Sequence, residues 1–233
     1  KQKTAYEIGV RLVGSEMCIR DRYYRLLNEG ARERLGGLHS APIVLASVDF
    51  AQVEQLQVAG RWGDAAALLA DRARGVEAAG AELLLICTNT MHKVAEEVQA
   101  AVAIPLLHIA DATATAVRRA NLTRVGLLGT AFTMEQAFYR DRLANHGLDV
   151  LVPDDAERAL VHRVIYDELC VGEIRQESRA AYRQVVGNLV ERGAEGVILG
   201  CTEVELLLRQ DDSDVPLFAT TRLHVQAALD AAG

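Results

Sequence analysis

Short apolar segments alternate with helical segments from about residue 40 to the end of the chain. In the apolar segments, such as ELLLIC (82–87) and GVILGC (196–201), apolar residues follow one another without alternating with polar ones. A strand that is buried on both faces has this pattern, which is typical of a parallel sheet between helices. The alternation therefore predicts an α/β fold of parallel sheets flanked by helices.

Periodicity and glycine stop signals give the expected order of the elements. We expect strands at 41–50, 82–87, 104–109, 124–130, 148–153, 196–201 and 215–220. We expect helices at 62–81, 91–102, 111–122, 134–147, 156–173, 176–194, 203–210 and 221–233.

An internal repeat divides this order into two halves. GAELLLICTNT begins at Gly80 and GAEGVILGCTE begins at Gly193, and Cys87 and Cys201 lie seven and eight residues into the two copies. We therefore predict two similar α/β domains, the first made of 1–102 plus 212–233 and the second of 103–211. Ligands bind at the carboxyl ends of strands in open parallel sheets, so we expect an active site in an interdomain cleft with the two cysteines facing it.

The start of the chain does not fit this repeat. VRLVGSEMCIRDR, within residues 1–22, has no clean periodicity and resembles a translated sequencing adapter. We expect residues 1–22 to be non-native sequence that replaces the first strand of the first domain, and we give Cys18 no functional weight. The alternative is a divergent native N-terminus.

Composition limits the classes of partner. The formal net charge is −7 at pH 7, which argues against nucleic acid or an anionic membrane as a partner. The sequence contains no run of 18 apolar residues, so we predict no membrane span. The four cysteines form no CxxC pair, which favours a reducing, cytoplasmic setting over a disulfide framework. His92 and Glu96 are spaced i, i+4, but without further ligands we interpret them as a solvated helix face and predict no metal site.

The two repeated cysteines carry the functional hypothesis. Each ends a predicted strand and precedes a helix, whose N-terminus lowers a thiol pKa and binds carboxylates. Two equivalent thiols at one site suit racemisation, in which one group removes a proton from one face of Cα and the other returns a proton to the opposite face. A structural role is the alternative for each cysteine, and we assign that role to Cys170.

ICTNTMHK, LGCTEVELL, IPLLHIADAT and LLGTAFTMEQAFYRDRL resemble the aspartate/glutamate racemase family, in its branch of broad-specificity amino-acid racemases. The resemblance covers about residues 23–230. It implies a cofactor-independent, two-base racemase with Cys87 and Cys201 as acid and base, and commonly a homodimer. It also implies that Thr88, Asn89, Thr90 and Thr202 bind the amino-acid substrate. The family's N-terminal strand and glycine-rich loop are not recognisable here, which puts the activity of this chain in doubt.

Other residues are candidates for contact with the substrate. Ser47 and Asp49 follow a predicted strand, Thr130 follows another, and Glu203 is placed to orient Cys201 or to meet an ammonium group. Each also has a structural interpretation, as a turn, a helix cap or an acidic first helical turn, and His224 is as readily a core histidine. The alternative functions are a related cysteine-dependent isomerase or decarboxylase of small carboxylates and a non-catalytic two-domain binding protein.

Overall fold

The computed structural model describes the backbone of residues 8–12 and 17–232 and the side chains of residues 21–232. The chain divides into two compact units, the first made of Lys1–His108 and His224–Gly233 and the second of Ile109–Leu223. Each unit contains a four-stranded sheet in which all strand pairs are parallel. The α/β fold with parallel sheets is therefore as predicted.

The first unit contains a sheet of strand order β2-β1-β3-β4. Its elements are β1 (Ile8–Leu12), α1 (Met17–Leu35), β2 (Ile43–Ser47), α2 (Phe50–Val58), α3 (Trp62–Ala78), β3 (Leu84–Ile86), the 3-10 helix η1 (Thr90–Val94), α4 (Ala95–Ala100), β4 (Leu106–Leu107) and the part of α11 (Thr220–Ala232) from His224 onward.

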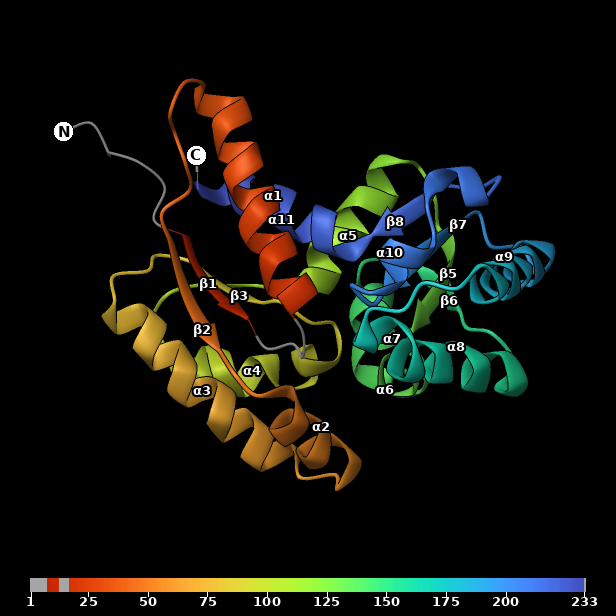
Figure 1. The fold of residues 1–233 in the computed structure, drawn as a ribbon, viewed down its shortest axis with the longest axis horizontal. Coiled ribbons are helices and arrows are strands. Elements are labelled where there is room, and N and C mark those ends of the chain that lie inside the picture. Colours follow the sequence, from red (N-terminus) through yellow and green to blue (C-terminus); the bar gives the residue numbers. More distant parts are fainter. Residues whose placement is uncertain (1–7, 13–16, 233) are drawn as a thin grey trace. The chain divides into compact units, whose positions relative to one another are not determined.

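Helices cover both faces of this sheet (Figure 1). Leu84 and Ile86 of β3 pack with α2, α3 and α4 on one face, whereas Leu85 packs with α1 and α11 on the other. Successive strand residues point to opposite faces, so an uninterrupted apolar strand is needed to supply both cores.

Strand β1 corrects one expectation. Residues 8–12 occupy a central position in the sheet and pair in parallel with both β2 and β3. The expectation that residues 1–22 lack the first strand is therefore wrong for this segment, because the ladder needs only backbone groups and IGVRL contains residue types that favour strands. Residues 13–16, between β1 and α1, lie outside the described residues, as does the side chain of Cys18.

The second unit contains a sheet of strand order β6-β5-β7-β8. Its elements are α5 (Ile109–Arg119), β5 (Arg124–Gly129), α6 (Ala131–Glu135), α7 (Ala137–Asn145), β6 (Asp149–Leu151), α8 (Asp155–Asp167), η2 (Leu169–Val171), α9 (Gln176–Glu191), β7 (Gly196–Gly200), α10 (Val204–Leu207), η3 (Gln210–Asp212), β8 (Leu217–Ala219) and the start of α11.

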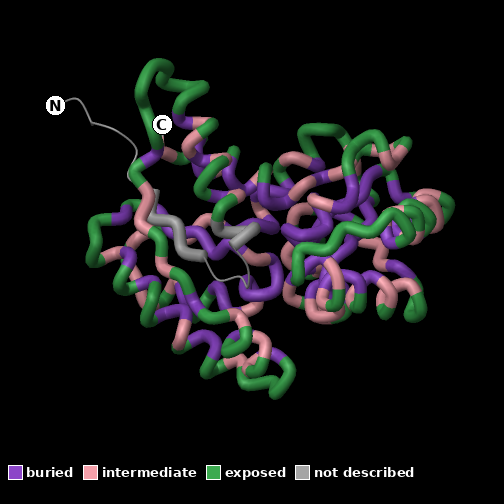
Figure 2. Tube along the Cα trace, in the orientation of Figure 1, coloured by how far each residue is buried: buried purple, intermediate pink, exposed green. Residues whose placement is uncertain are grey.

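This sheet is also covered on both faces. Helices α8, α9 and α10 pack on one face, and α5 and α7 pack on the other. In Figure 2 the buried residues gather in the inner part of each unit.

The unit boundaries differ from the predicted ones. Strand β4 pairs with β3 of the first unit, although the prediction assigned residues 103–211 to the second domain. Strand β8 pairs with β7 of the second unit, although the prediction assigned residues 212–233 to the first domain. Both predicted boundaries were wrong because each excluded the fourth strand from the sheet that it completes.

The two sheets share one strand order. In each unit the second strand in sequence is at one edge, followed by the first, the third and the fourth. Cys87 directly follows β3, the third strand of the first unit, and Cys201 directly follows β7, the third strand of the second. The repeat seen in the sequence therefore places the two cysteines at topologically equivalent positions.

Gly200, the last residue of β7, is predicted to tolerate no side chain. A Cβ atom there would lie 2.8 Å from Leu127 Cδ1 and 2.9 Å from the Leu128 carbonyl oxygen. We expect Gly200→Ala to lower the free energy of unfolding by about 1–3 kcal/mol, as overpacked cores do. Gly187→Ala in α9 is the matched control, because its Cβ would contact nothing within 4 Å. Urea denaturation that gives both variants the same midpoint would contradict this packing.

Candidate active site

The candidate residues of the first unit lie at the carboxyl edge of its sheet. Ser47 ends β2, Cys87 follows β3 and His108 follows β4. Strand β1 lies between β2 and β3. The carboxyl ends of β2 and β3 are therefore about 10 Å apart at the usual strand spacing. The carboxyl edge is where ligands bind in open parallel sheets, so the position of Cys87 suits contact with a substrate.

Cys87 is fully buried in the core between the sheet and helices α1 and α11. Its neighbours in this core include Tyr23, Leu85 and Val225. Burial raises the pKa of the Cys87 thiol well above its ordinary value. The sequence predicted that the following helix would lower that pKa, but η1 is a five-residue 3-10 helix, and burial outweighs so short a helix.

The turn after Cys87 is held by hydrogen bonds between its backbone carbonyl groups and His92. Thr88 is half-buried, and Asn89 and Thr90 are buried at the start of η1. The Thr88 carbonyl oxygen lies 2.8 Å from His92 Nδ1, and the Asn89 carbonyl accepts a 3.1 Å hydrogen bond from the His92 backbone N–H. The predicted substrate-binding residues therefore share one turn with Cys87.

His92 is buried, contrary to the prediction from the sequence. It was expected on a solvated helix face with Glu96, but its side chain is only 3% exposed, whereas Glu96 is exposed. The ring of His92 lies 4.4 Å from that of His108 and 5.8 Å from that of His224, measured between centroids. Its position five residues after Cys87 was the only available signal, because the neighbouring histidines are distant in sequence.

His224 is a core histidine with a defined tautomer. Its Nε2 lies 2.9 Å from the Leu107 carbonyl oxygen, which can only accept, so Nε2 carries the proton. Nδ1 then accepts a hydrogen bond from the Tyr23 hydroxyl at 2.9 Å. Burial lowers the pKa of His224 to about 3, and the nearby His92 contributes to the shift. His224 is therefore neutral at physiological pH and joins α1 and α11 to the end of β4.

Asp49 has a structural role in the first unit. It is exposed, and its Oδ1 accepts a 3.1 Å hydrogen bond from the Ala51 backbone N–H as the N-cap of α2. Ser47 is exposed at the end of β2. Contact of either residue with a substrate stays a prediction.

The second unit brings Thr130 and Cys201 close together. They follow β5 and β7, adjacent strands whose last residues, Gly129 and Gly200, are in register. Thr130 is buried and caps α6 through Oγ1, which accepts a 3.4 Å hydrogen bond from the Thr133 N–H. Thr202, directly after Cys201, is also buried.

Cys201 is hydrogen-bonded to a carboxylate. Its Sγ lies 2.9 Å from Glu203 Oε2, and both side chains are less than 10% exposed. Burial, followed by the negative charge of Glu203, raises the pKa of the Cys201 thiol, and burial raises the pKa of Glu203. The thiol is therefore the donor, and Glu203 is positioned to accept its proton. Cys170 packs in the same core as Cys201.

His162 was not anticipated from the sequence. Its Nδ1 accepts a 3.2 Å hydrogen bond from the Ala131 N–H at the start of α6, next to Thr130. Burial lowers the pKa of His162. Helix α8, which carries it, gave no signal that this position differs from other polar positions on the helix.

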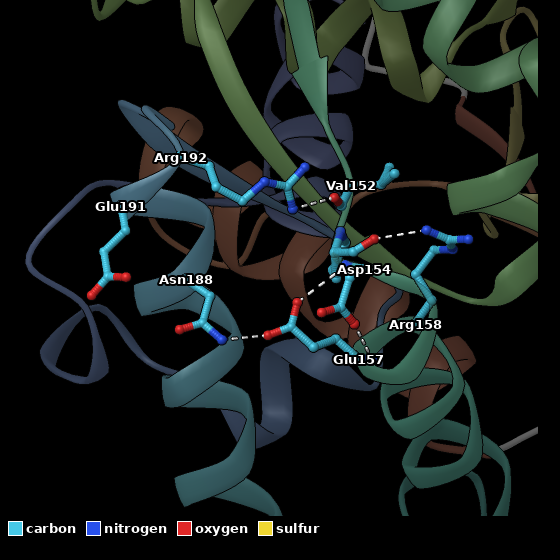
Figure 3. Close-up of a pocket in the computed structure, with 8 residues that line it drawn as sticks. Val152, Asp154, Glu157, Arg158, Asn188, Glu191 and Arg192 are labelled. Atoms are coloured by element: carbon cyan, nitrogen blue, oxygen red, sulfur yellow. Dashed lines mark hydrogen bonds between the residues drawn. The ribbon is translucent and has the colours of Figure 1, made fainter.

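A separate hollow of about 590 Å³ lies beside the end of β6 and the start of α8 (Figure 3). Its polar groups bond to one another: Arg192 donates to the Val152 carbonyl, and Asn188 donates to Glu157. Asp154 and Glu157 form the capping box of α8. These bonds account for the hollow as part of a helix cap, so we do not place the active site there.

Two further observations apply to the described part of the chain. Among its side chains, no group of three or more His, Cys, Asp or Glu residues is arranged to hold a metal ion. None of its helices combines the length and the apolar character needed to cross a membrane.

Known proteins resemble this chain in sequence and in fold. The family described as Asp/Glu/Hydantoin racemase matches residues 21–228. A Yersinia pestis structure, named as a candidate Asp/Glu racemase, is 49% identical with a TM-score of 0.90 over 97% of this chain and 99% of that one. An aspartate racemase homologue from Pyrococcus horikoshii OT3 is 31% identical with a TM-score of 0.83 over the same shares. The broad specificity amino-acid racemase RacX of Bacillus subtilis is 25% identical over 151 residues, which span 63% of each chain.

Proposed function

Because the chain belongs to the Asp/Glu/hydantoin racemase family, we propose that it is a cofactor-independent amino-acid racemase with Cys87 and Cys201 as its acid and base. The observation that carries the proposal is topological: each cysteine directly follows the third strand of its unit, in sheets of the same strand order. The two similar units thus supply two equivalent thiols. Racemisation needs such a pair, because the forward and reverse reactions are near mirror images and each uses one group on either face of Cα.

The proposed reaction moves one proton at a time. One cysteine, as a thiolate, removes the Cα proton, and the electron pair of the C–H bond passes into a carbanion conjugated with the carboxylate. The other cysteine, as a thiol, gives its proton to the opposite face of Cα. The first cysteine then holds a proton and the second has lost one, so the reverse reaction starts from the opposite protonation state.

Burial affects how the thiolate forms. Because burial raises the pKa of both thiols, we expect both to be protonated in the free protein. Glu203 is the group placed to take the Cys201 proton. A bound ammonium group near either sulfur would favour the thiolate further, since an opposite charge within about 4–6 Å stabilises the ionised form.

The predicted substrate-binding residues have corresponding roles. We propose that Thr88, Asn89 and Thr90 on the first unit and Thr202 on the second bind the carboxylate or the ammonium group of the substrate, with Thr130 beside Cys201. Hydrogen-bond donors directed at the carboxylate would stabilise the charge that develops on it as the proton leaves. Homodimerisation and a cytoplasmic location are further parts of this proposal.

The experiment that tests the proposal is chiral analysis of L-amino acids incubated one by one with the protein, starting with aspartate and glutamate. We expect at least one to approach a racemic mixture from either enantiomer. Activity should persist with hydroxylamine, which traps pyridoxal phosphate, and with EDTA, which removes metal ions. If no amino acid is inverted, or either reagent abolishes inversion, the proposed chemistry is wrong.

A further inference from the structure

His92 makes two successive contacts with the turn that follows Cys87. Its backbone N–H donates to the Asn89 carbonyl at 3.1 Å, and its Nδ1 lies 2.8 Å from the Thr88 carbonyl oxygen. A carbonyl oxygen can only accept, so Nδ1 carries a proton and donates it. One buried residue therefore fixes the two peptide groups on which the predicted substrate-binding side chains are mounted.

The ring of His92 is itself held in place. It lies 4.4 Å from the ring of His108 and meets the ring of His224 edge-on at 5.8 Å. His224 is fixed at both ring nitrogens, by Tyr23 and by the Leu107 carbonyl. Packing and hydrogen bonds from α1, α11 and the end of β4 thus restrict the orientation from which His92 reaches Thr88.

We propose that His92 is a positioning residue for the Cys87 half of the reaction. The inference rests on the proposed function, because it assigns His92 to one of the two proton transfers. Without the Nδ1–H donor, the Thr88 carbonyl loses this hydrogen bond and the Cys87–Asn89 turn is held less firmly. Displacements of about 1 Å at a reacting group cost on the order of 100-fold in rate. His92 is not expected to affect the proton transfer at Cys201, which is held by its own contact with Glu203 in the second unit.

Two substitutions separate the hydrogen bond from the volume of the side chain. His92→Leu fills the core but removes the donor, whereas His92→Asn places an amide N–H close to the position of Nδ1. Each is made in a Cys201→Ser background, where only Cys87 can exchange Cα–H, and in a Cys87→Ser background, where only Cys201 can. His39→Leu is the matched control, since His39 is exposed.

The readout is the rate of deuterium exchange at Cα in D₂O as a function of substrate concentration, followed by proton NMR with both enantiomers of the amino acid that the panel identifies; the rates compared below are those at saturating substrate. With the Cys201→Ser background, we expect His92→Leu to slow exchange at least 10-fold and His92→Asn to restore most of it. With the Cys87→Ser background, we expect both to raise the KM for exchange, because residues 88–90 still bind the substrate, but to leave the rate at saturating substrate within about twofold of the parent. These results would assign His92 to the Cys87 half alone.

A purely structural role for His92 gives a different pattern. Equal loss of the exchange rate at saturating substrate in both backgrounds, or no loss in either, would overturn the inference and leave the proposed function intact. Absence of exchange in both parents would overturn the proposed function and the inference with it. Nitrogen-15 NMR of the His92 ring gives a test independent of activity, because an unprotonated Nδ1 would contradict the hydrogen bond to Thr88.

Discussion

Replacing either Cys87 or Cys201 with serine is expected to abolish racemisation in both directions. A full turnover needs one group on each face of Cα, and a serine hydroxyl is far too weak an acid to ionise near neutral pH. Positioned acids and bases contribute about 10²–10⁴-fold each, so we expect losses of at least this size in kcat. Chiral chromatography of reactions started from each enantiomer measures the loss.

Cys170→Ala is the matched control for these substitutions. Cys170 is buried in the same core as Cys201 but follows no strand of the sheet. We expect this variant to keep most of its activity, with a modest loss of stability from the shortened side chain. If Cys170→Ala lost as much activity as Cys201→Ser, the assignment of Cys201 as the second base would lose its support.

The second large effect is a loss of stability in acid that originates at His224. Its pKa is about 3 in the folded protein and 6.5 ordinarily, so between these values the unfolded chain binds the additional proton. The stabilisation is therefore complete above pH 6.5 and is lost as the pH falls toward 3. From this pKa difference, linkage gives a total loss of roughly 3–5 kcal/mol in the free energy of unfolding. His92 and Tyr23 face the ring of His224, and neither supplies a negative charge near neutral pH to offset its protonation.

His224→Gln isolates this contribution. Glutamine can still donate to the Leu107 carbonyl but does not titrate, so its free energy of unfolding should fall less steeply between pH 7 and pH 4 than that of the parent. Urea denaturation across this range measures both slopes, and carboxylates that titrate in both proteins cancel in the comparison. His39→Gln, at an exposed position, should keep the parent's slope. Parallel slopes for His224→Gln and the parent would mean that His224 titrates alike in the folded and unfolded chain, which would contradict its lowered pKa in the folded protein.

Local patterns predicted the parallel α/β fold and the positions of the cysteines. Apolar runs such as 196–201 are typical of buried strands, and residues that follow such strands lie at the carboxyl edge of a sheet. Pairing between distant strands could not be predicted in the same way. Strands β4 and β8 are two and three residues long, so their periodicity could not show which sheet each one completes.

The histidine cluster could not be predicted from the sequence for a related reason. His92, His108 and His224 come from η1, the end of β4 and α11, and their contacts depend on how these elements pack. The contacts with His108 and His224 show that His92 belongs to a buried cluster and does not lie on an exposed helix face. The pKa values of the cysteines also needed the structure, because the sequence indicates a helix N-terminus but not the depth of burial that outweighs it.

The two-base mechanism is tested most directly by Cα–H exchange in D₂O, followed by proton NMR of the L- and D-substrate with Cys87→Ser and Cys201→Ser. Each variant keeps one thiol, which can remove a proton from one enantiomer and return a deuteron to the same face. We predict that each variant exchanges one enantiomer without inverting it, and that the two variants act on opposite enantiomers. Exchange of the same enantiomer by both variants, or continued racemisation by either one, would contradict the assignment of Cys87 and Cys201 to opposite faces of Cα.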